Sequence, residues 1–280
     1  MEQVRQNPLK GYFRQFKLYL KLPSGTSYYT PGTINFSELG EVGIMPMTGN
    51  DELMLKNPDA LLNGEALVEV IKSCAPGVSN PKMLLTNDID AIITAVRYAT
   101  YNDHLETELT CPVCKHTNLF KLDLQYSLDN MTFLESEYVV NLESGLSVFV
   151  KPYSFPELLK GLHAQFEQSK ISRAIENDSM DETQKMKLFA SAFKEISNVT
   201  YSLMCNSVIK VVDEQRNINV TDKTDIKEFL QNIDKKSVDK ISDLIKEING
   251  IGIKKTFTAV CTKCEHAWEN EIDFNPVNFS

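Results

Sequence analysis

Two short segments decide the fold, Cys111-Pro-Val-Cys114-Lys-His116 and Cys261-Thr-Lys-Cys264-Glu-His266. Each contains two cysteines separated by two residues, and each ends with a histidine two positions after the second cysteine. Apolar and polar residues alternate before and after both pairs, as they do in half-buried strands. The sequence therefore predicts the same unit twice: a strand, a CxxCxH turn and a second strand. The predicted strands cover residues 105–110 and 119–124 around the first pair, and 256–260 and 268–274 around the second.

The four paired cysteines favour a structural zinc ion. Tetrahedral Zn²⁺ needs four soft ligands, and two tight turns can each supply two thiolates. Because cysteine fills all four positions, no coordination site stays open for a catalytic water, and a closed site is structural. We predict one Zn²⁺ per chain, with His116 and His266 as candidates for groups that support the ligands from the second shell. A site with three cysteines and one histidine is the less favoured variant. The predicted ligands are Cys111, Cys114, Cys261 and Cys264.

Other interpretations of the CxxC pairs stay open. In a thioredoxin-like protein, one CxxC pair opens a helix of a βαβ unit, but neither pair here precedes a segment with helical periodicity. The pairs could also be independent reduced thiols. The two remaining cysteines, Cys74 and Cys205, lie in apolar segments. We predict that both are small buried side chains.

The distance between the two pairs is unusual. Between Cys114 and Cys261 lie 146 residues, whereas compact zinc ribbons have about 15–20 residues there. Zinc would therefore clamp the two ends of a large insertion, and metal binding supports folding by about 10 kcal/mol in small zinc peptides. We predict an α+β fold of mixed short strands and helices, with a split four-cysteine zinc ribbon closing a large helical insertion.

The predicted segments follow from this arrangement. They are a β-rich segment (1–50), a helical segment with the first ribbon half (51–126), a hairpin with a helical insertion (127–253), and the second ribbon half with a C-terminal tail (254–280).

Hydrophobic periodicity and capping residues predict the other elements. In the first predicted strand, at 13–22, Phe16 and Leu18 share a face with Leu20 and Leu22. The basic residues at this end are assigned to the solvated face of the strand, with a phosphate-binding arm as the less favoured alternative; they are Arg5, Lys10, Arg14, Lys17 and Lys21. Further strands are expected at 41–45 and in a hairpin at 138–150. Helices are expected at 65–74, after an Asn87 cap, from 155 to about 175, after Asp181, and at 222–233 and 237–248.

Composition excludes several classes of protein. The chain has 280 residues, of which 42% are hydrophobic and 24% charged, and a mean hydropathy of −0.24. These values are ordinary for globular proteins and exclude wholesale disorder. No segment approaches the roughly 18 apolar residues that cross a bilayer, and the first residues lack the apolar core of a secretory signal. We expect a soluble intracellular protein with no membrane partner.

Charge and motif content argue against nucleic-acid binding and catalysis. The net charge is −9, and phosphate contacts need a basic surface. Gly250-Ile-Gly252 follows a predicted helix, so it is a helix stop, not a dinucleotide-binding loop. His163 and Glu167 lie one turn apart, but a metalloprotease motif needs a second histidine. We predict that the protein is not an enzyme and has no catalytic residues and no small-molecule substrate.

Several phrases, in the order they occur, carry a family resemblance. They are Leu22-Pro-Ser-Gly25, Asp51-Glu-Leu-Met-Leu55, Leu62-Asn-Gly-Glu65, Arg97-Tyr-Ala-Thr-Tyr101 before the first CxxC pair, Val211-Val-Asp-Glu214, and the second CxxC pair with Phe279. Along most of its length the chain resembles the baseplate hub assembly proteins of T-even-like contractile-tailed phages. The resemblance implies a non-enzymatic hub subunit or assembly factor whose partners are other baseplate hub proteins. It would lie in the virion baseplate and, during assembly, in the host cytoplasm.

Two other function classes compete with this one. A zinc-ribbon nucleic-acid-binding regulatory protein is the main alternative, but acidic residues outnumber lysines around the second CxxC pair and repel phosphate. An oxidoreductase would need thiols that cycle without a metal. A hub protein binds through surfaces, and interface cores are usually aromatic, so Tyr28, Tyr29 and Phe279 are the interface candidates. The alternative for Tyr28 and Tyr29 is that they cover the local core.

Overall fold

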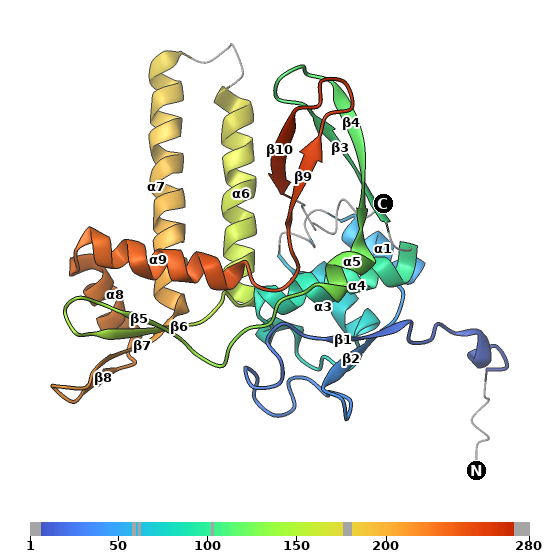
Figure 1. Ribbon diagram of the computed structural model, residues 1–280, viewed down its shortest axis with the longest axis horizontal. Coiled ribbons are helices and arrows are strands. Elements are labelled where there is room, and N and C mark those ends of the chain that lie inside the picture. The colour runs from blue at the N-terminus through green and yellow to red at the C-terminus, as the bar shows by residue number, and fades with distance from the viewer. Residues whose placement is uncertain (1–6, 58–59, 61–62, 102–103, 176–180, 272–280) are drawn as a thin grey trace.

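The computed structural model describes residues 7–57, 60, 63–101, 104–175 and 181–271 (Figure 1). Short antiparallel strands and helices are mixed along the chain, so the predicted α+β class is confirmed. The strands are β1 (Leu18–Lys21), β2 (Glu41–Ile44), β3 (His104–Thr110), β4 (Thr117–Asp123), β5 (Tyr138–Asn141), β6 (Ser147–Val150), β7 (Val208–Asp213), β8 (Ile218–Val220), β9 (Thr256–Val260) and β10 (Ala267–Glu271). The helices are η1 (Lys10–Tyr12), α1 (Gly49–Leu55), α3 (Glu65–Cys74), η2 (Pro81–Met83), α4 (Thr86–Tyr101), α5 (Leu124–Asp129), α6 (Phe155–Ile175), α7 (Glu182–Ser207), α8 (Lys223–Asn232) and α9 (Lys235–Asn249).

The described strands form four separate sheets. Three have two strands each, β1–β2, β3–β4 and β9–β10, and the fourth has the order β5-β6-β7-β8. Every pairing within them is antiparallel. Isolated two-stranded sheets are marginally stable at best, so helices or other sheets must cover the apolar faces of these three.

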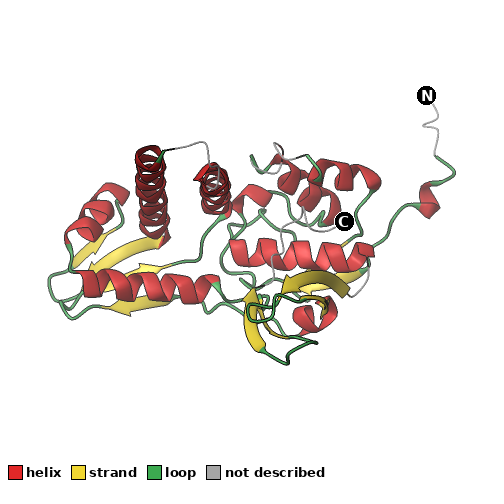
Figure 2. Cartoon of the chain, turned by 90° about the horizontal axis from the view of Figure 1, so that it is seen from above, coloured by secondary structure: helices red, strands yellow, loops and turns green. Residues whose placement is uncertain are grey.

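The buried apolar side chains form two clusters, and the helices and strands that carry them lie side by side (Figure 2). The first surrounds α4, whose predicted apolar stripe (Ile89, Ile92, Ile93 and Val96) is buried against α3, β1 and β2. All buried members of the second lie between Val140 and Ile248, in the four-stranded sheet, the end of α7, α8 and α9. The second cluster therefore falls within the predicted insertion, and the chain returns to the first cluster at Ile253. The segment boundaries at 50, 126 and 253 stay predictions.

Asn87 corrects one prediction and joins the two clusters. The expected helix begins at Thr86, so Asn87 lies inside α4 and does not cap it. Its Nδ2 donates hydrogen bonds to the carbonyls of Ile248, at 2.9 Å, and Ile251, at 2.7 Å. Ile248 lies in the last turn of α9 and Ile251 lies just after it, where backbone oxygens lack helical partners. Asn87 therefore holds the end of α9 against the start of α4.

The segment before β1 also differs from the prediction. The strand expected at 13–22 is only four residues long, and Phe16 is exposed, with its ring 5.7 Å from that of Tyr19. Arg14 does not lie on a solvated strand face, because its guanidinium donates to the carbonyls of Pro46 and Ser73, both at 2.7 Å. It also forms a 3.3 Å ion pair with the buried Asp51. An unpaired buried carboxylate would be unfavourable, and the ion pair with Asp51 therefore stabilises the inward position of Arg14.

Helices α6 and α7 form an antiparallel hairpin that projects from the base of the molecule (Figure 1). Helix α6 spans residues 155–175 as predicted, and the carboxylate of Glu157 accepts a hydrogen bond from the Ser154 N–H at 3.1 Å. On α7, Ala192 is buried, whereas Met186, Phe189 and Phe193 are exposed. Among the described helices, none combines the length and the apolar character needed to cross a membrane.

Candidate metal centre

Each CxxC pair lies in the turn of a β-hairpin. Strands β3 and β4 pair up to Thr110 and Thr117, and β9 and β10 pair up to Val260 and Ala267. The predicted unit of strand, CxxCxH turn and strand is therefore confirmed twice, with each turn formed by six residues (111–116 and 261–266).

The two turns share the same backbone hydrogen bonds. The N–H of Cys111 donates to the carbonyl of His116, and the N–H of Cys261 donates to the carbonyl of His266, both at 2.9 Å. The residue after each second cysteine donates back to the first cysteine's carbonyl, at 3.1 Å from Lys115 and 3.0 Å from Glu265. Both of these residues are left-handed, with φ of 58° and 57°. A left-handed conformation is unfavourable by about 1–2 kcal/mol for a residue other than glycine. The two turns have this conformation at equivalent positions.

The two hairpins contact each other and bring the four sulfur atoms together. The Sγ atoms of Cys111 and Cys264 are 3.7 Å apart, and those of Cys114 and Cys261 are 3.5 Å apart. All four lie within 4.8 Å of one another, and none forms a disulfide. In a tetrahedron with metal–sulfur bonds of about 2.3 Å, the sulfur–sulfur distance is about 3.8 Å. The sulfur positions thus fit one tetrahedral metal ion.

Backbone donors and neighbouring thiols set the acidity of the cluster. Burial raises the pKa of Cys261, but N–H groups of Lys263 and Cys264 outweigh it and lower this pKa to about 6. The N–H of His266 lowers the pKa of Cys264, yet the neighbouring thiols and burial raise it overall to about 12. The thiolate of Cys261 is therefore stabilised, while the neighbouring thiols oppose the ionisation of Cys264. A divalent cation would remove this opposition, because it stabilises all four thiolates together.

Aromatic side chains hold the two hairpins together below the sulfur cluster. The ring of Phe120 on β4 lies 5.8 Å from Phe257 and 6.1 Å from Trp268, in edge-to-face arrangements. Ala259, on β9, is fully buried. Edge-to-face pairs contribute about 0.5–1.5 kcal/mol each beyond the burial of their area. The hairpins therefore have their own contact surface, which positions the turns before a metal binds.

Asn118 is a site residue that the sequence analysis missed. It is 3% exposed, and its Nδ2 donates to the carbonyl of His116 at 3.0 Å and to the Sγ of Cys261 at 3.7 Å. Its Oδ1 accepts two hydrogen bonds of 2.8 Å from Thr262, one from N–H and one from Oγ1. Asn118 therefore connects the first hairpin to the second turn. The sequence signal that could have identified Asn118 is its position: it is a polar residue on the inward face of β4, paired with Leu109 of β3.

The two histidines contribute their backbone carbonyls to the turns. In the described part of the chain, the group of closely spaced ligand atoms contains the four thiols and neither imidazole. Both histidines are exposed, and the ring of His266 stacks on Trp268 at 6.1 Å. A supporting role of the rings toward a metal stays a prediction.

The interface candidates lie away from the metal centre. The hydroxyl of Tyr29 donates to the buried carboxylate of Asp88 and accepts the N–H of Leu85 at 2.9 Å, and its ring packs against the first cluster. The hydroxyl of Tyr28 donates to the carbonyl of Glu135. These contacts fit the alternative that both tyrosines cover the local core, and their interface role stays a prediction. Phe279 lies outside the described residues.

The two unpaired cysteines are buried, as predicted. Cys74 lies in the first cluster and Cys205 in the second. Burial raises the pKa of Cys74 to about 11, so its thiol stays protonated and unreactive at neutral pH.

Comparison with known proteins gives one match. A family model described as T4 bacteriophage base plate protein matches residues 14–279, a range that contains both hairpins and everything between them. Searches of curated proteins and of solved structures gave no match.

Proposed function

This chain belongs to the T4 bacteriophage base plate protein family, and from this premise we propose that it is a subunit or assembly factor of the central hub of the baseplate. It acts through protein contacts and not through catalysis. The observation that carries the proposal is the family match over residues 14–279. The ordered resemblance to hub assembly proteins, which runs along most of the chain, supports the hub as the place within the baseplate.

A structural zinc ion, one per chain, is the second part of the proposal. Support comes from four thiols with tetrahedral spacing, from backbone donors that stabilise a thiolate, and from Asn118, which connects the hairpins. Zinc prefers thiolate ligands in closed tetrahedral sites of this kind. The ligands lie before and after the long insertion that contains the second cluster. Bound zinc would therefore hold the two ends of this insertion together.

The surroundings of the thiols favour zinc over redox chemistry and over phosphate contacts. Neither pair opens a helix, whose N-terminus lowers the thiol pKa in thioredoxin-like enzymes. Both hairpins expose carboxylates, of which Glu106 pairs with Lys121 at 2.9 Å, whereas no ion pair is found for Glu108 and Glu269 among the described residues. Exposed carboxylates repel a phosphate backbone. A role in nucleic-acid binding is therefore the weaker alternative.

The hub proposal is tested by placing a stop codon in the gene of an infecting phage. We expect heads to fill with DNA while tails fail to form on complete baseplates, as seen by electron microscopy of lysates. Expression of the full chain from a plasmid should restore tails. Normal tails and normal infectivity without the chain would contradict the proposal.

The zinc proposal has a separate test. The chain is purified under reducing conditions, dialysed against metal-free buffer, and its metals are measured by mass spectrometry. We expect one zinc per chain. A chain that is folded and active in tail assembly but contains no zinc would contradict this part and leave the hub proposal standing.

A further inference from the structure

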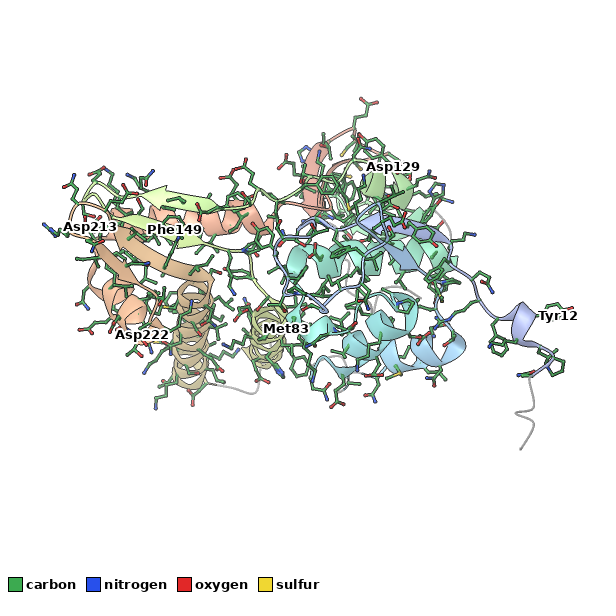
Figure 3. All side chains as sticks on the ribbon, turned by 90° about the horizontal axis from the view of Figure 1, so that it is seen from below. Tyr12, Met83, Asp129, Phe149, Asp213 and Asp222 are labelled. Carbon is green, nitrogen blue, oxygen red and sulfur yellow. The ribbon has the colours of Figure 1, made fainter. Side chains whose placement is uncertain are left out.

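The segment ahead of Arg14 extends away from the rest of the molecule. We call residues 7–13 the arm, and it contains η1. Figure 1 shows the arm projecting beyond β1, and Figure 3 shows Tyr12 well separated from the other labelled residues. The hydrogen bonds of residues 7–13 join residues 7–15 to one another, such as Tyr12 N–H to the Leu9 carbonyl at 2.9 Å.

The arm exposes large apolar side chains. Tyr12 is 87% exposed, Leu9 60% and Phe13 54%. Exposed rings continue along the chain on Phe16 and Tyr19. Three large apolar side chains within seven residues are unlike a solvated tail, and exposed apolar surfaces of this kind mark binding sites. The side chains of Leu9, Tyr12, Phe13, Phe16 and Tyr19 are called the aromatic strip below.

Arg14 fixes the point at which the arm leaves the body. Its guanidinium bonds to Pro46 and Ser73 and pairs with Asp51, so the chain is anchored from this residue onward. An arm that starts at a fixed anchor presents its side chains in a limited set of directions. This lowers the entropy cost of binding compared with a free tail.

The charge of this region is opposite to that of the rest of the chain. Between Glu2 and Glu38 there is no acidic residue, but there are five basic ones: Arg5, Lys10, Arg14, Lys17 and Lys21. Residues 1–37 therefore carry +4 and residues 38–280 carry −13, which together give the net charge of −9. Lys10, Lys17 and Lys21 are exposed beside the aromatic strip. A surface that matches the strip must be apolar and acidic.

We propose that the arm and the aromatic strip dock onto residues 38–280 of a second copy of this chain. The acidic body of another copy supplies the complementary charge, while the hydrogen bonds of residues 7–13 stay within residues 7–15. Apolar anchors supply most of the affinity, and the lysines steer the approach of the two copies. The proposal goes beyond a place in the baseplate, because it assigns a self-association surface that does not involve the cysteines.

Isotope mixing with a photo-crosslinker tests this directly. A benzophenone amino acid replaces Tyr12 in the full chain, unlabelled and ¹⁵N-labelled chains are mixed, and crosslinked peptides are identified after irradiation. We expect pairs that join the arm of a light chain to a peptide from residues 38–280 of a heavy chain, and the reverse. Crosslinks found only within chains of one label, or none between chains at the highest concentration at which the chain stays soluble, would overturn the proposal.

Sedimentation equilibrium measures how much each part of the surface contributes. We expect the double variant Tyr12→Ser, Phe13→Ser to weaken self-association by about 30-fold, because buried aromatic anchors dominate interfaces. The control replaces two exposed side chains of the same N-terminal segment outside the strip, Thr26→Ala and Ser27→Ala, and should leave association unchanged. Equal weakening by both double variants, or by neither, would refute the assignment.

Charge reversal separates a protein partner from a nucleic acid. Lys10→Glu with Lys17→Glu should weaken self-association, and raising the salt concentration should weaken it in the native chain as well. Lys187→Glu with Lys194→Glu changes the net charge equally, but on exposed positions of α7 within the acceptor residues 38–280, and should not weaken self-association. Retention of a 30-nucleotide single strand by the native chain at 150 mM salt, lost in Lys10→Glu with Lys17→Glu and accompanied by a monomeric sedimentation profile, would overturn the proposal in favour of nucleic-acid binding.

Discussion

Replacing Asn118 with aspartate changes one functional group beside the sulfur cluster. The Nδ2 group, which donates to the His116 carbonyl and to the Sγ of Cys261, becomes a carboxylate oxygen. The other oxygen keeps its place as the acceptor of both hydrogen bonds from Thr262. The substitution therefore removes the donor and adds a negative charge while the shape of the side chain is kept.

The size of the effect follows from the 3.7 Å distance between this group and the Cys261 sulfur. Two like charges at that distance repel by about 4 kcal/mol at an effective dielectric constant of 20. Partial protonation of the aspartate and the bound cation reduce this repulsion. Residues that orient metal ligands contribute 10–100-fold to metal affinity. We therefore expect Asn118→Asp to lower zinc affinity by about 100-fold at pH 8.

The effect should shrink as the pH falls. The buried carboxyl beside a thiolate has a raised pKa, so lowering the pH returns a proton that can again be donated toward the sulfur. Relative to the native chain at the same pH, the loss of affinity should be smaller at pH 6 than at pH 8. If Asn118 had only a packing role, the ratio of the native to the variant zinc affinity would be the same at pH 6 and pH 8.

Competition with a chromophoric zinc chelator under reducing conditions measures both affinities on the full chain. Asn219→Asp, an exposed asparagine on β8, is the control and should not change zinc affinity. A loss of less than about threefold in a variant with native circular dichroism, or a ratio independent of pH, would refute the role given to Asn118.

Three further predictions concern the ligands and the core. Cys114→Ser and Cys264→Ser should each lose bound metal and solubility, as shown by metal analysis of the soluble fraction, whereas normal folding and zinc-free stability in these variants would rule out the clamp. Burial raises the pKa of Asp88 to about 6, above its ordinary value. Its contribution to stability is therefore fully present below about pH 4 and is lost as the pH rises to 6, so the native chain should lose up to about 3 kcal/mol relative to Asp88→Asn over that range in urea titrations. If the free energy of unfolding changed equally with pH in the native chain and in Asp88→Asn, this role of Asp88 would be excluded. Gly64 has φ +77°, and an added Cβ would lie 2.6 Å from Cδ2 of Leu159, so Gly64→Ala should lower the free energy of unfolding by about 2–4 kcal/mol in urea titrations. Gly161→Ala, with open space around it, should be neutral or stabilising in the same titrations.

The two hairpins could be predicted because their signals are local. Alternation of apolar and polar residues marks the strands, and two cysteines at a spacing of three mark each turn, all within about twenty residues. The helix that starts at Phe155 was predictable for the same reason, since Ser154, Pro156 and Glu157 are neighbours in the sequence. The family resemblance placed the chain in the baseplate, and the family match agrees.

The missed features depend on contacts between distant residues. Asn118 meets Thr262 across 144 positions, Asn87 meets Ile248 across 161, and Arg14 meets Ser73 across 59. In each case a polar side chain satisfies a backbone group or sulfur that no nearby residue can reach. Local sequence patterns assign such residues to the solvated surface or to helix caps, because these patterns give no information about which distant segments of the chain meet in the fold.

The most direct test of a hub role is quantitative mass spectrometry of purified mature particles against the lysate of infected cells. We expect the chain in particles at a few copies each, in a fixed ratio to the other baseplate proteins, or, for an assembly factor, on tail intermediates in the lysate and not on particles. Finding it associated with neither particles nor tail intermediates would contradict a role in the baseplate.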